Sequence, residues 1–380
     1  MEIREKMKEE VKGFRYFSGE EAEKREEIRK ILVETFEKYG FEPAETPVIE
    51  YEEFVRGNNP NDEAVSDIFR LKDKGKRNLA LRYEFTFQLK RLIKNKKLPY
   101  KRHQIGPVFR DEPVSANRFR QITQCDIDTI GSSVKDEAEI LATVSEILDK
   151  IGIKPKIYIN NRKLLNEILN ELKIKNKEKA IREIDKFDKL SEKEVRANLK
   201  KIQAEKVLDI IKKPESYFKK YKSYKEIEQL KKFCKNYGIN VVFSPSLARG
   251  LAYYNSSVFE IKCGSKDSVA GGGSYMTDNI QATGISFGLE RLSNLAKLDI
   301  NKQKYLMVSL NQDKKAIELS KKIRAKDKIA SIYYGRPSKA LEYANSYGFS
   351  KVIFVGEKEI KAKKFKVKDM KTGKEGVLRI

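Results

Sequence analysis

The sequence predicts an α+β protein built on an antiparallel sheet, with a helical segment inserted in it and a small α/β unit at the carboxyl end. Two strand-like stretches, 100–110 and 118–130, are joined by the polar loop DEPVSAN and predict a long hairpin. Residues 162–238 are lysine-rich and helical in pattern, with no internal glycine. From residue 304 onwards apolar strands alternate with helical segments, which is typical of a largely parallel sheet.

The amino-terminal part carries signals for one helix followed by an extended run. Ser18 and Glu21 form a capping-box pattern, and Gly40 follows the last apolar position, so a helix is predicted between them. Residues 41–49 are predicted to be an edge or interrupted strand, because the two prolines within them cannot donate to a strand ladder. The apolar residues at helical spacing are Ile28, Ile31, Leu32, Phe36 and Tyr39.

The remaining elements follow from alternation, apolar runs and glycine. Residues 77–86 alternate enough to predict a strand, and residues 87–94 a short helix. The three glycines at 271–273 are most often a turn in such a pattern, although glycine also permits close backbone approach to a ligand. The other predicted helices are 135–151, 313–325 and 337–347, and the other predicted strands are 155–159, 241–245, 256–262, 305–310, 329–334 and 351–356.

Shifts in composition place domain boundaries near residues 160, 238 and 304. The lysine-rich helical segment interrupts the sheet-forming sequence and is therefore predicted to be an insertion. The last 75 or so residues are predicted to fold as a unit of their own. The predicted division is 1–160, 161–238, 239–300 and 304–380.

The charge of the chain points to a polyanionic partner. Lys and Arg number 80 against 56 Asp and Glu, a formal net charge of +24. Such a surface attracts nucleic acid or anionic membrane. Lysine-rich composition also occurs where solubility or heat tolerance shapes the surface, and charge alone does not separate these explanations.

Several classes of protein are excluded or disfavoured by composition. No run of 18 apolar residues occurs and the amino terminus is charged, so we expect a soluble, cytoplasmic protein with no membrane partner. Cys125, Cys234 and Cys263 are widely separated, which fits a reducing compartment. The only histidine, His103, excludes a histidine-rich zinc site, and we expect it to pack on its strand. An enzyme of this composition would work by positioning and charge.

The predicted hairpin carries the strongest candidate residues. Arg110 ends its first strand, Arg118 begins the return, and the polar residues Gln124, Asp126 and Asp128 alternate along it. An arginine beside a basic loop could clamp a triphosphate while the polar residues face a second substrate. Charged hairpins with solvated side chains are also common, so the pattern by itself leaves both interpretations open.

Two later segments carry further candidates. Arg249 precedes the pair Tyr253 and Tyr254, which on a strand would point to opposite faces, one lining a pocket and the other packing in the core. The glycine cluster precedes Tyr275, and Arg291 stands at the start of a predicted helix, where it could reach a phosphate. Core packing and an ordinary turn are the alternatives. Neither the P-loop nor the GxGxxG pattern is present.

Taken in order, these segments resemble the signature motifs of class II aminoacyl-tRNA synthetases, and specifically of the histidyl-tRNA synthetase family. The second class II motif resembles QIGPVFRDE with RFRQITQCDID, and the third resembles GISFGLERL. The two histidine signatures resemble RGLAYYNSSVFE and AGGGSY. IDKFDKLSEKEV is similar to part of the family's insertion domain, and GRPSKALEYANSYGFSKVIFVGEKE to its anticodon-binding domain.

The resemblance implies a class II catalytic sheet flanked by helices, interrupted by the helical insertion and followed by an anticodon-binding α/β domain. It also implies a cytoplasmic homodimer, with the helix from Glu20 and the strand ending near Pro47 at the interface. The implied activity is that of an ATP-dependent, AMP-forming histidine–tRNA ligase. Its substrates would be L-histidine, ATP with Mg²⁺, and tRNA(His), and no metal bound by protein side chains is predicted.

Site residues carry over from the family one by one. Arg110 and Arg249 would hold the α-phosphate of ATP from opposite sides during catalysis. The residues around the nucleotide would be Arg110, Glu112, Arg118 and Arg291. The residues binding histidine would be Glu84, Thr86, Gln124, Asp128, Tyr253, Tyr254 and Tyr275.

The sequence departs from the family pattern at a few positions. An acidic residue is usual at Ala252, an arginine at Ser274 and an aspartate at Met276, while Val114 and Asn117 replace a proline and a glycine. None of these is assigned a direct contact, so we interpret them as divergence.

Two other functions remain as alternatives. One is a synthetase-like regulatory subunit of histidine biosynthesis, which binds histidine without charging tRNA. Such a subunit generally lacks the last domain and has lost the arginines of the motifs. This chain retains both the last domain and the arginines. The other is a general RNA-binding protein, which the net charge also fits.

Overall fold

The structure is a computed structural model, and it describes residues 10–57, 67–115, 118–188, 190–248, 253–264, 268–300 and 302–378. Its contacts divide the chain into two units, Met1–Leu298 and Asp299–Ile380. The finer division of the first unit at residues 160 and 238 stays a prediction. In the described ranges no helix has the length and apolar character needed to cross a membrane.

The predicted hairpin lies in the middle of an eight-stranded sheet in the first unit. Strands β5 (Tyr100–Phe109) and β6 (Gln121–Ile130) pair antiparallel, with Tyr100 opposite Ile130. The order is β1-β5-β6-β11-β10-β9-β7-β8, and only β1 with β5 and β7 with β8 pair parallel. The other strands are β1 (Glu42–Pro43), β7 (Lys156–Asn161), β8 (Val241–Phe243), β9 (Tyr254–Lys262), β10 (Ser268–Thr277) and β11 (Ile280–Gly288).

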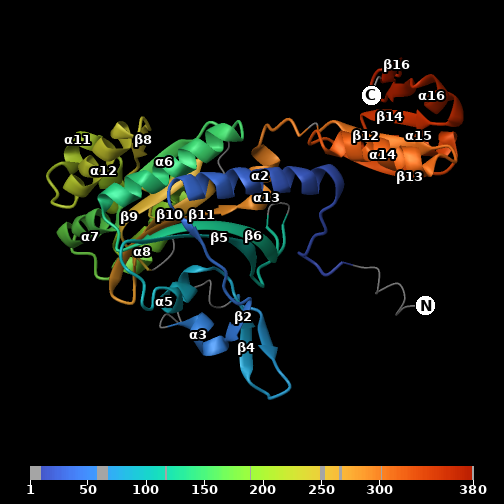
Figure 1. The fold of residues 1–380 in the computed structure, drawn as a ribbon. Helices are drawn as coiled ribbons and strands as arrows, with labels where there is room; N and C mark the ends of the chain where they lie inside the picture. Colours follow the sequence, from blue (N-terminus) through green and yellow to red (C-terminus); the bar gives the residue numbers. More distant parts are fainter. Residues whose placement is uncertain are drawn as a thin grey trace. The chain divides into compact units, whose positions relative to one another are not determined.

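Helices cover one face of this sheet, and Figure 1 shows α2 (Gly19–Lys38) and α6 (Val134–Lys150) running across it. Helix α13 (Leu289–Leu295) packs against α2 and β6. Cys125 and Ile127 of β6 are fully buried in the same apolar cluster as Ile28 and Leu141 of these helices. Because side chains alternate along a strand, the residues between them face the other side of the sheet.

The first helix begins where predicted, but without the predicted capping box. Ser18 is its N-cap, yet the Ser18 side chain makes no capping hydrogen bond. Glu21 instead pairs with Arg15, whose Nη2 lies 3.3 Å from Glu21 Oε1. The helix ends at Lys38, and Gly40 follows with φ of 79°, a conformation that favours glycine.

The strand predicted at 77–86 is shorter than expected. It is β4 (Asn78–Leu81), the centre of a three-stranded sheet with β2 (Ile49–Tyr51) and β3 (Arg70–Lys72). At Arg82 the chain leaves this sheet, because the Arg82 carbonyl accepts from Phe109 N and its guanidinium donates to the carbonyl of Pro107 at 2.8 Å. The next segment is irregular, followed by a 3-10 turn (Thr86–Gln88) and the short helix α5 (Leu89–Leu92). Helix α3 (Glu52–Arg56) follows β2.

The glycine cluster is not the predicted turn but the middle of β10. A Cβ atom on Gly273 would lie 2.5 Å from the carbonyl oxygen of Ser257 on β9. A Cβ atom on Gly284, on β11, would lie 2.0 Å from Oδ1 of Asp128 on β6. Glycine is needed at both positions because neighbouring strands occupy the space of a side chain.

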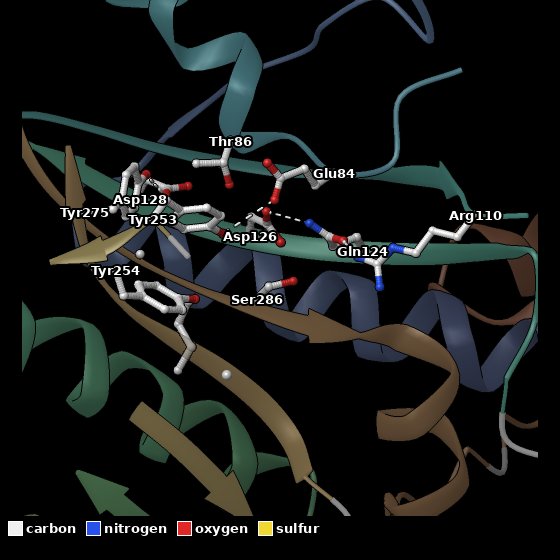
Figure 2. A pocket seen from close by; sticks show the side chains of 13 residues that line it. Glu84, Thr86, Arg110, Gln124, Asp126, Asp128, Tyr253, Tyr254, Tyr275 and Ser286 are labelled. Carbon is white, nitrogen blue, oxygen red and sulfur yellow. Dashed lines mark hydrogen bonds between the residues drawn. The ribbon is translucent and has the colours of Figure 1, made fainter. Parts of the chain in front are cut away.

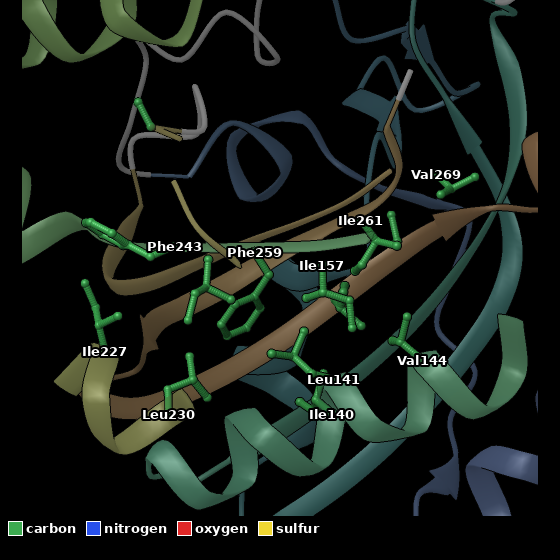
Figure 3. Close-up of a cluster of buried hydrophobic side chains, with 14 of the residues drawn as sticks. Ile140, Leu141, Val144, Ile157, Ile227, Leu230, Phe243, Phe259, Ile261 and Val269 are labelled. Carbon is green, nitrogen blue, oxygen red and sulfur yellow. The ribbon is translucent and has the colours of Figure 1, made fainter. Parts of the chain in front are cut away.

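The lysine-rich segment is helical, as predicted, and its apolar side chains are continuous with the core of the sheet. Ile227 and Leu230 of α12 lie with Phe243 of β8 and Phe259 of β9 in the same buried cluster (Figure 3). The segment therefore folds onto the sheet. Its helices are α7 (Arg162–Glu171), α8 (Lys177–Asp185), a 3-10 turn (Lys186–Asp188), α9 (Glu192–Lys200), α10 (Val207–Ile211), α11 (Glu215–Phe218) and α12 (Tyr224–Asn236).

The second unit has a five-stranded sheet in the order β13-β12-β14-β15-β16. The first three strands are parallel, as the alternation of strands and helices predicts, whereas β15 and β16 add an antiparallel edge that the sequence did not indicate. Buried clusters lie against both sides of its central strands. The elements are β12 (Lys304–Ser309), α14 (Asp313–Arg324), β13 (Ile329–Tyr334), α15 (Pro337–Ser346), β14 (Lys351–Val355), α16 (Glu357–Ala362), β15 (Phe365–Asp369) and β16 (Glu375–Leu378).

Candidate active site

A cavity lies over the face of the large sheet that turns away from α2 and α6 (Figure 2). Its walls come from the segment before α5, from the β5–β6 hairpin and from the strands β9, β10 and β11. The structure thus brings together segments that are up to 200 residues apart. Eight residues predicted from the sequence line it: Glu84, Thr86, Arg110, Gln124, Asp128, Tyr253, Tyr254 and Tyr275.

The floor of the cavity includes Asp126, a residue of the predicted polar alternation to which family resemblance assigned no role. Gln124, Asp126 and Asp128 are spaced two apart on β6, so all three face the cavity. The alternation predicted from the sequence thus holds for Asp126 as for its two neighbours. Ser286, opposite Asp126 in the β6–β11 ladder, also lines the cavity and was not identified from the sequence.

Asp128 is held by two partners. Its Oδ1 accepts a hydrogen bond from the Tyr275 hydroxyl, and its Oδ2 lies 2.7 Å from Nη2 of Arg102, which stands opposite it on β5. Arg102 is fully buried and was not identified from the sequence. Burial raises the pKa of Asp128, and Arg102 and Tyr275 act in the other direction. A buried cation beside the carboxylate therefore supports its charged form.

The positive end of the cavity is Arg110, just after β5. Its Nε donates to the carbonyl of Tyr83 at 3.2 Å and its Nη2 donates to Gln124 Oε1 at 3.4 Å. Both bonds are long, and a guanidinium has five N–H donors. Arg110 is therefore positioned by the protein while keeping donors for an anionic ligand.

Both tyrosines of the pair line the cavity, and Tyr254 also packs in a buried apolar cluster, so the expected separation into one pocket residue and one core residue is not strict. Tyr253 precedes β9 in a turn, where strand alternation does not apply. Its hydroxyl lies 3.5 Å from Oε2 of Glu84, and its ring centroid is 4.9 Å from that of Tyr254 and 5.7 Å from that of Tyr275. The three rings form an aromatic wall at the end of the cavity away from Arg110 (Figure 2).

Three predicted nucleotide contacts lie outside this cavity. Arg118 Nη1 is 3.9 Å from Glu112 Oε2 beside the hairpin loop, and Arg291 donates to the carbonyl of Ser268. Arg249, like Ala252 and Asn117, falls outside the described residues. The roles of these residues toward the nucleotide stay predictions.

A buried ion pair ties three elements together next to the cavity. Nη2 of Arg25, on α2, lies 3.0 Å from Oγ1 of Thr123 and 3.0 Å from Oε1 of Glu290 on α13. Glu290 also accepts the backbone N–H of Thr123 at 3.0 Å. Because Thr123 precedes Gln124, this network fixes β6 from the helix-covered face, opposite the cavity.

His103 contributes nothing to the cavity. It is buried, its ring centroid lies 5.4 Å from that of Phe36, and burial lowers its pKa. Among the described residues, no group of three or more His, Cys, Asp or Glu side chains is placed to hold a metal ion.

Comparison with known sequences gives a consistent family. The family model described as Histidyl-tRNA synthetase matches residues 13–292. Histidine–tRNA ligase 1 of Bacillus cereus is 33% identical over 411 residues, which cover 96% of this chain and 94% of that protein. The histidine–tRNA ligase of Methanocaldococcus jannaschii is 33% identical over 410 residues, 97% of each chain.

Solved structures share the fold. Histidyl-tRNA synthetase from Nostoc sp. PCC 7120 superposes with a TM-score of 0.85 at 24% identity, over 98% of this chain and 97% of that one. A Bacillus halodurans protein described as an ATP phosphoribosyltransferase regulatory subunit/histidyl-tRNA synthetase superposes with a TM-score of 0.80 at 20% identity. The superposition covers 92% of this chain and 98% of that one. The predicted α+β fold, an antiparallel sheet flanked by helices, is confirmed. On the match of its sequence along nearly the whole length, the chain belongs to the histidyl-tRNA synthetase family.

Proposed function

We propose that this protein is a histidine–tRNA ligase. It joins histidine to ATP as histidyl-adenylate with release of pyrophosphate, and then transfers the histidyl group to the 3′-terminal ribose of tRNA(His). The observation that carries the proposal is the polarity of the cavity, with Arg110 at one end and Glu84, Asp126 and Asp128 further in. An amino acid whose carboxylate faces the arginine and whose N–H groups face the acids fits this arrangement.

The activation step suits the residues present. A carboxylate oxygen of histidine attacks the α-phosphorus, and the new O–P bond forms as the bond to pyrophosphate breaks. No proton has to be removed, so alignment of the reactants and cations at the developing charge supply the catalysis. Arg110 takes this role at the cavity, with Arg249, Arg291, Arg118 and Glu112 assigned to the nucleotide by family resemblance. ATP enters with Mg²⁺ on its phosphates.

The transfer step also requires no side chain to act as a base. A ribose hydroxyl of tRNA attacks the carbonyl carbon of the adenylate, AMP leaves, and a phosphate oxygen of the adenylate can accept the hydroxyl proton. The core position of His103 is compatible with this chemistry, because the reaction requires no imidazole.

We assign the finer organisation by the same family resemblance. Residues 1–160 and 239–300 form the catalytic part, residues 161–238 are an insertion toward the acceptor arm, and residues 304–380 bind the anticodon. Tyr334 and Tyr347 of the second unit support RNA binding, because 60% and 62% of their surface is exposed and exposed aromatic rings can stack on bases. The protein acts as a homodimer in the cytoplasm.

Exchange of labelled pyrophosphate into ATP tests this function. Among a panel of amino acids, histidine should support exchange, and Arg110→Ala should lower it about 100- to 1000-fold, the usual loss on removing one donor to a developing charge. Thermal stability should change little, because Arg110 makes only two long hydrogen bonds. Arg77→Ala serves as the control, since Arg77 pairs with Asp73 on an exposed turn of the small sheet. A folded protein that shows no exchange would be a histidine-binding subunit or a general RNA-binding protein instead.

A further inference from the structure

Asp126 occupies the middle of the cavity floor, between Gln124 and Asp128 on the same face of β6 (Figure 2). Only 4% of its surface is exposed. Family resemblance assigns roles to both of its neighbours on this face but none to Asp126. Burying a carboxylate this deeply is costly unless a hydrogen-bond partner, from the protein or from a ligand, satisfies it.

Hydrogen bonds and the ion pair with Arg102 together leave one carboxylate oxygen of the cavity floor without a partner among the described residues. Both oxygens of Asp128 are engaged, by Tyr275 and by Arg102. Oδ2 of Asp126 accepts from Nε2 of Gln124 at 2.8 Å. Oδ1 of Asp126 is buried and has no hydrogen-bond partner in the described ranges. An N–H donor on a ligand would satisfy it, and leaving it unsatisfied costs roughly 1–3 kcal/mol.

The charges around Asp126 favour a donor with positive character. Burial raises the pKa of Asp126 to about 6; Arg102 opposes this shift, and the neighbouring Asp128 adds to it. Gln124 and Ser286 also favour its charged form. Arg102 already forms the ion pair with Asp128, at 2.7 Å. The carboxylates of Asp126 and Asp128 thus share one buried cation, Arg102. A ligand N–H with partial or full positive charge would balance the negative charge of Asp126.

The position of Asp126 along the strand indicates which part of histidine it meets. Gln124 contacts Arg110, which marks the carboxylate end of the substrate. Two residues along a strand correspond to about 7 Å, so Asp126 lies one side-chain length deeper, toward the aromatic wall of Tyr253 and Tyr275. An imidazole ring extending from an amino acid bound at Arg110 reaches this depth.

We propose that Oδ1 of Asp126 accepts an N–H of the substrate's imidazole ring and that this contact makes the pocket select a ring bearing an N–H donor. The inference rests on the proposed histidine ligase function. It identifies Asp126 as a specificity-determining residue, while Asp128 holds the floor of the pocket through Arg102 and Tyr275. A ring of similar shape without an N–H would leave Asp126 unsatisfied, and sites built this way reject such analogues strongly.

The test compares two substrates in two forms of the full-length protein. Histidine and thiazolylalanine, whose ring has no N–H, are each assayed by pyrophosphate exchange with the wild type and with Asp126→Asn. For histidine, kcat/KM should fall about 10- to 100-fold in the variant, mainly through KM, because the amide oxygen of asparagine is an uncharged and weaker acceptor than the carboxylate. For thiazolylalanine it should be nearly unchanged. Asp126→Ala should likewise lower kcat/KM for histidine and leave that for thiazolylalanine nearly unchanged. This variant introduces no amide group into the site.

Controls separate this role from a structural one. Glu139→Gln makes the same change of charge on α6, where Glu139 pairs with Lys101 away from the cavity, and should leave both substrates unaffected. Thermal unfolding of Asp126→Asn should show no loss of stability, because an uncharged amide is cheaper to bury than a carboxylate. Equal losses for both substrates, or no loss for histidine, would overturn the inference while leaving the ligase function intact. Absence of exchange by the wild type would overturn the function, and the inference with it.

Discussion

Replacing Glu137 with glutamine should stabilise the first unit of the chain at alkaline pH. Glu137 lies on α6 with 4% of its surface exposed, and it accepts hydrogen bonds from the hydroxyls of Ser257, at 2.6 Å, and Ser274. Burial raises its pKa to about 7 from an ordinary value of 4.5. The two hydroxyls and Lys163 oppose this effect without cancelling it, while Glu226 adds to it. The carboxylate is thus buried with hydroxyl partners and without a cation in contact.

The sign and size of the effect follow from the two pKa values. Because the pKa of Glu137 is higher in the folded than in the unfolded protein, folding favours the protonated carboxyl group. The protonated group stabilises the fold fully below about pH 4.5, and this stabilisation is lost as pH rises through about 7. Each pKa unit of difference corresponds to about 1.4 kcal/mol, so complete ionisation costs about 3 kcal/mol. Glutamine keeps the shape, accepts from one serine and donates to the other, and has no ionisation to suppress.

Calorimetric unfolding of the wild type and Glu137→Gln at pH 5, 7 and 9 would measure this. The chain has no tryptophan, so calorimetry or circular dichroism is preferable to fluorescence. Between pH 5 and 9 the advantage of the variant should grow by about 2–3 kcal/mol. For a unit of nearly 300 residues this is a shift in Tm of roughly 3–5 °C. The difference between the two proteins is the relevant quantity, because Asp126 titrates in the same range.

Glu226→Gln provides a control of opposite sign. Burial acts to raise the pKa of Glu226, but hydrogen bonds from Lys163, Ser256 and Asn161 outweigh it and lower the pKa. Its charge therefore stabilises the fold above the ordinary pKa of 4.5, so this variant should be less stable than the wild type by a nearly constant amount at pH 5, 7 and 9. Parallel pH profiles for the wild type and Glu137→Gln would refute the conclusion that burial holds Glu137 in its protonated form.

Two further predictions concern the cavity and the second unit. Gly284→Ala should raise the KM for histidine in exchange at least about 10-fold, because the new Cβ would displace the Asp128 carboxylate, 2.0 Å away. Gly288→Ala, where nothing lies within 4 Å, should have little effect, and equal KM values for the two variants would contradict this account. Removal of residues 299–380 should weaken tRNA charging while sparing pyrophosphate exchange, and loss of both would show that the second unit is needed for the fold or the dimer.

The sequence predicted the parts of the site that depend on local pattern. The hairpin was recognised from two alternating stretches around a polar loop, and its strands lie within two or three residues of the predicted bounds. Alternation then placed Gln124 and Asp128 on one face, which the cavity confirms. Asp126 shares their spacing and lies on the same face, but it received no role because family resemblance gives it none.

Other features depended on neighbours distant in sequence. The run at Gly271–Gly273 matches a turn as well as a strand, and only the closeness of β9 and β11 explains why glycine stands inside β10. The strand predicted through residue 86 ends at Leu81, because Arg82 finds partners near Pro107. The order of residue types along the chain does not show which distant segments will lie in contact.

Local chemistry thus determined which segments form strands and helices and which side chains could serve as acids, bases and phosphate ligands. Tertiary structure decided what surrounds each of them. Asp128 is paired with a buried arginine, Glu137 is buried with hydroxyl partners, and one oxygen of Asp126 is buried without a hydrogen-bond partner among the described residues. The reason is physical: the cost of a buried charge depends on its three-dimensional neighbours, and these come from strands far apart along the chain.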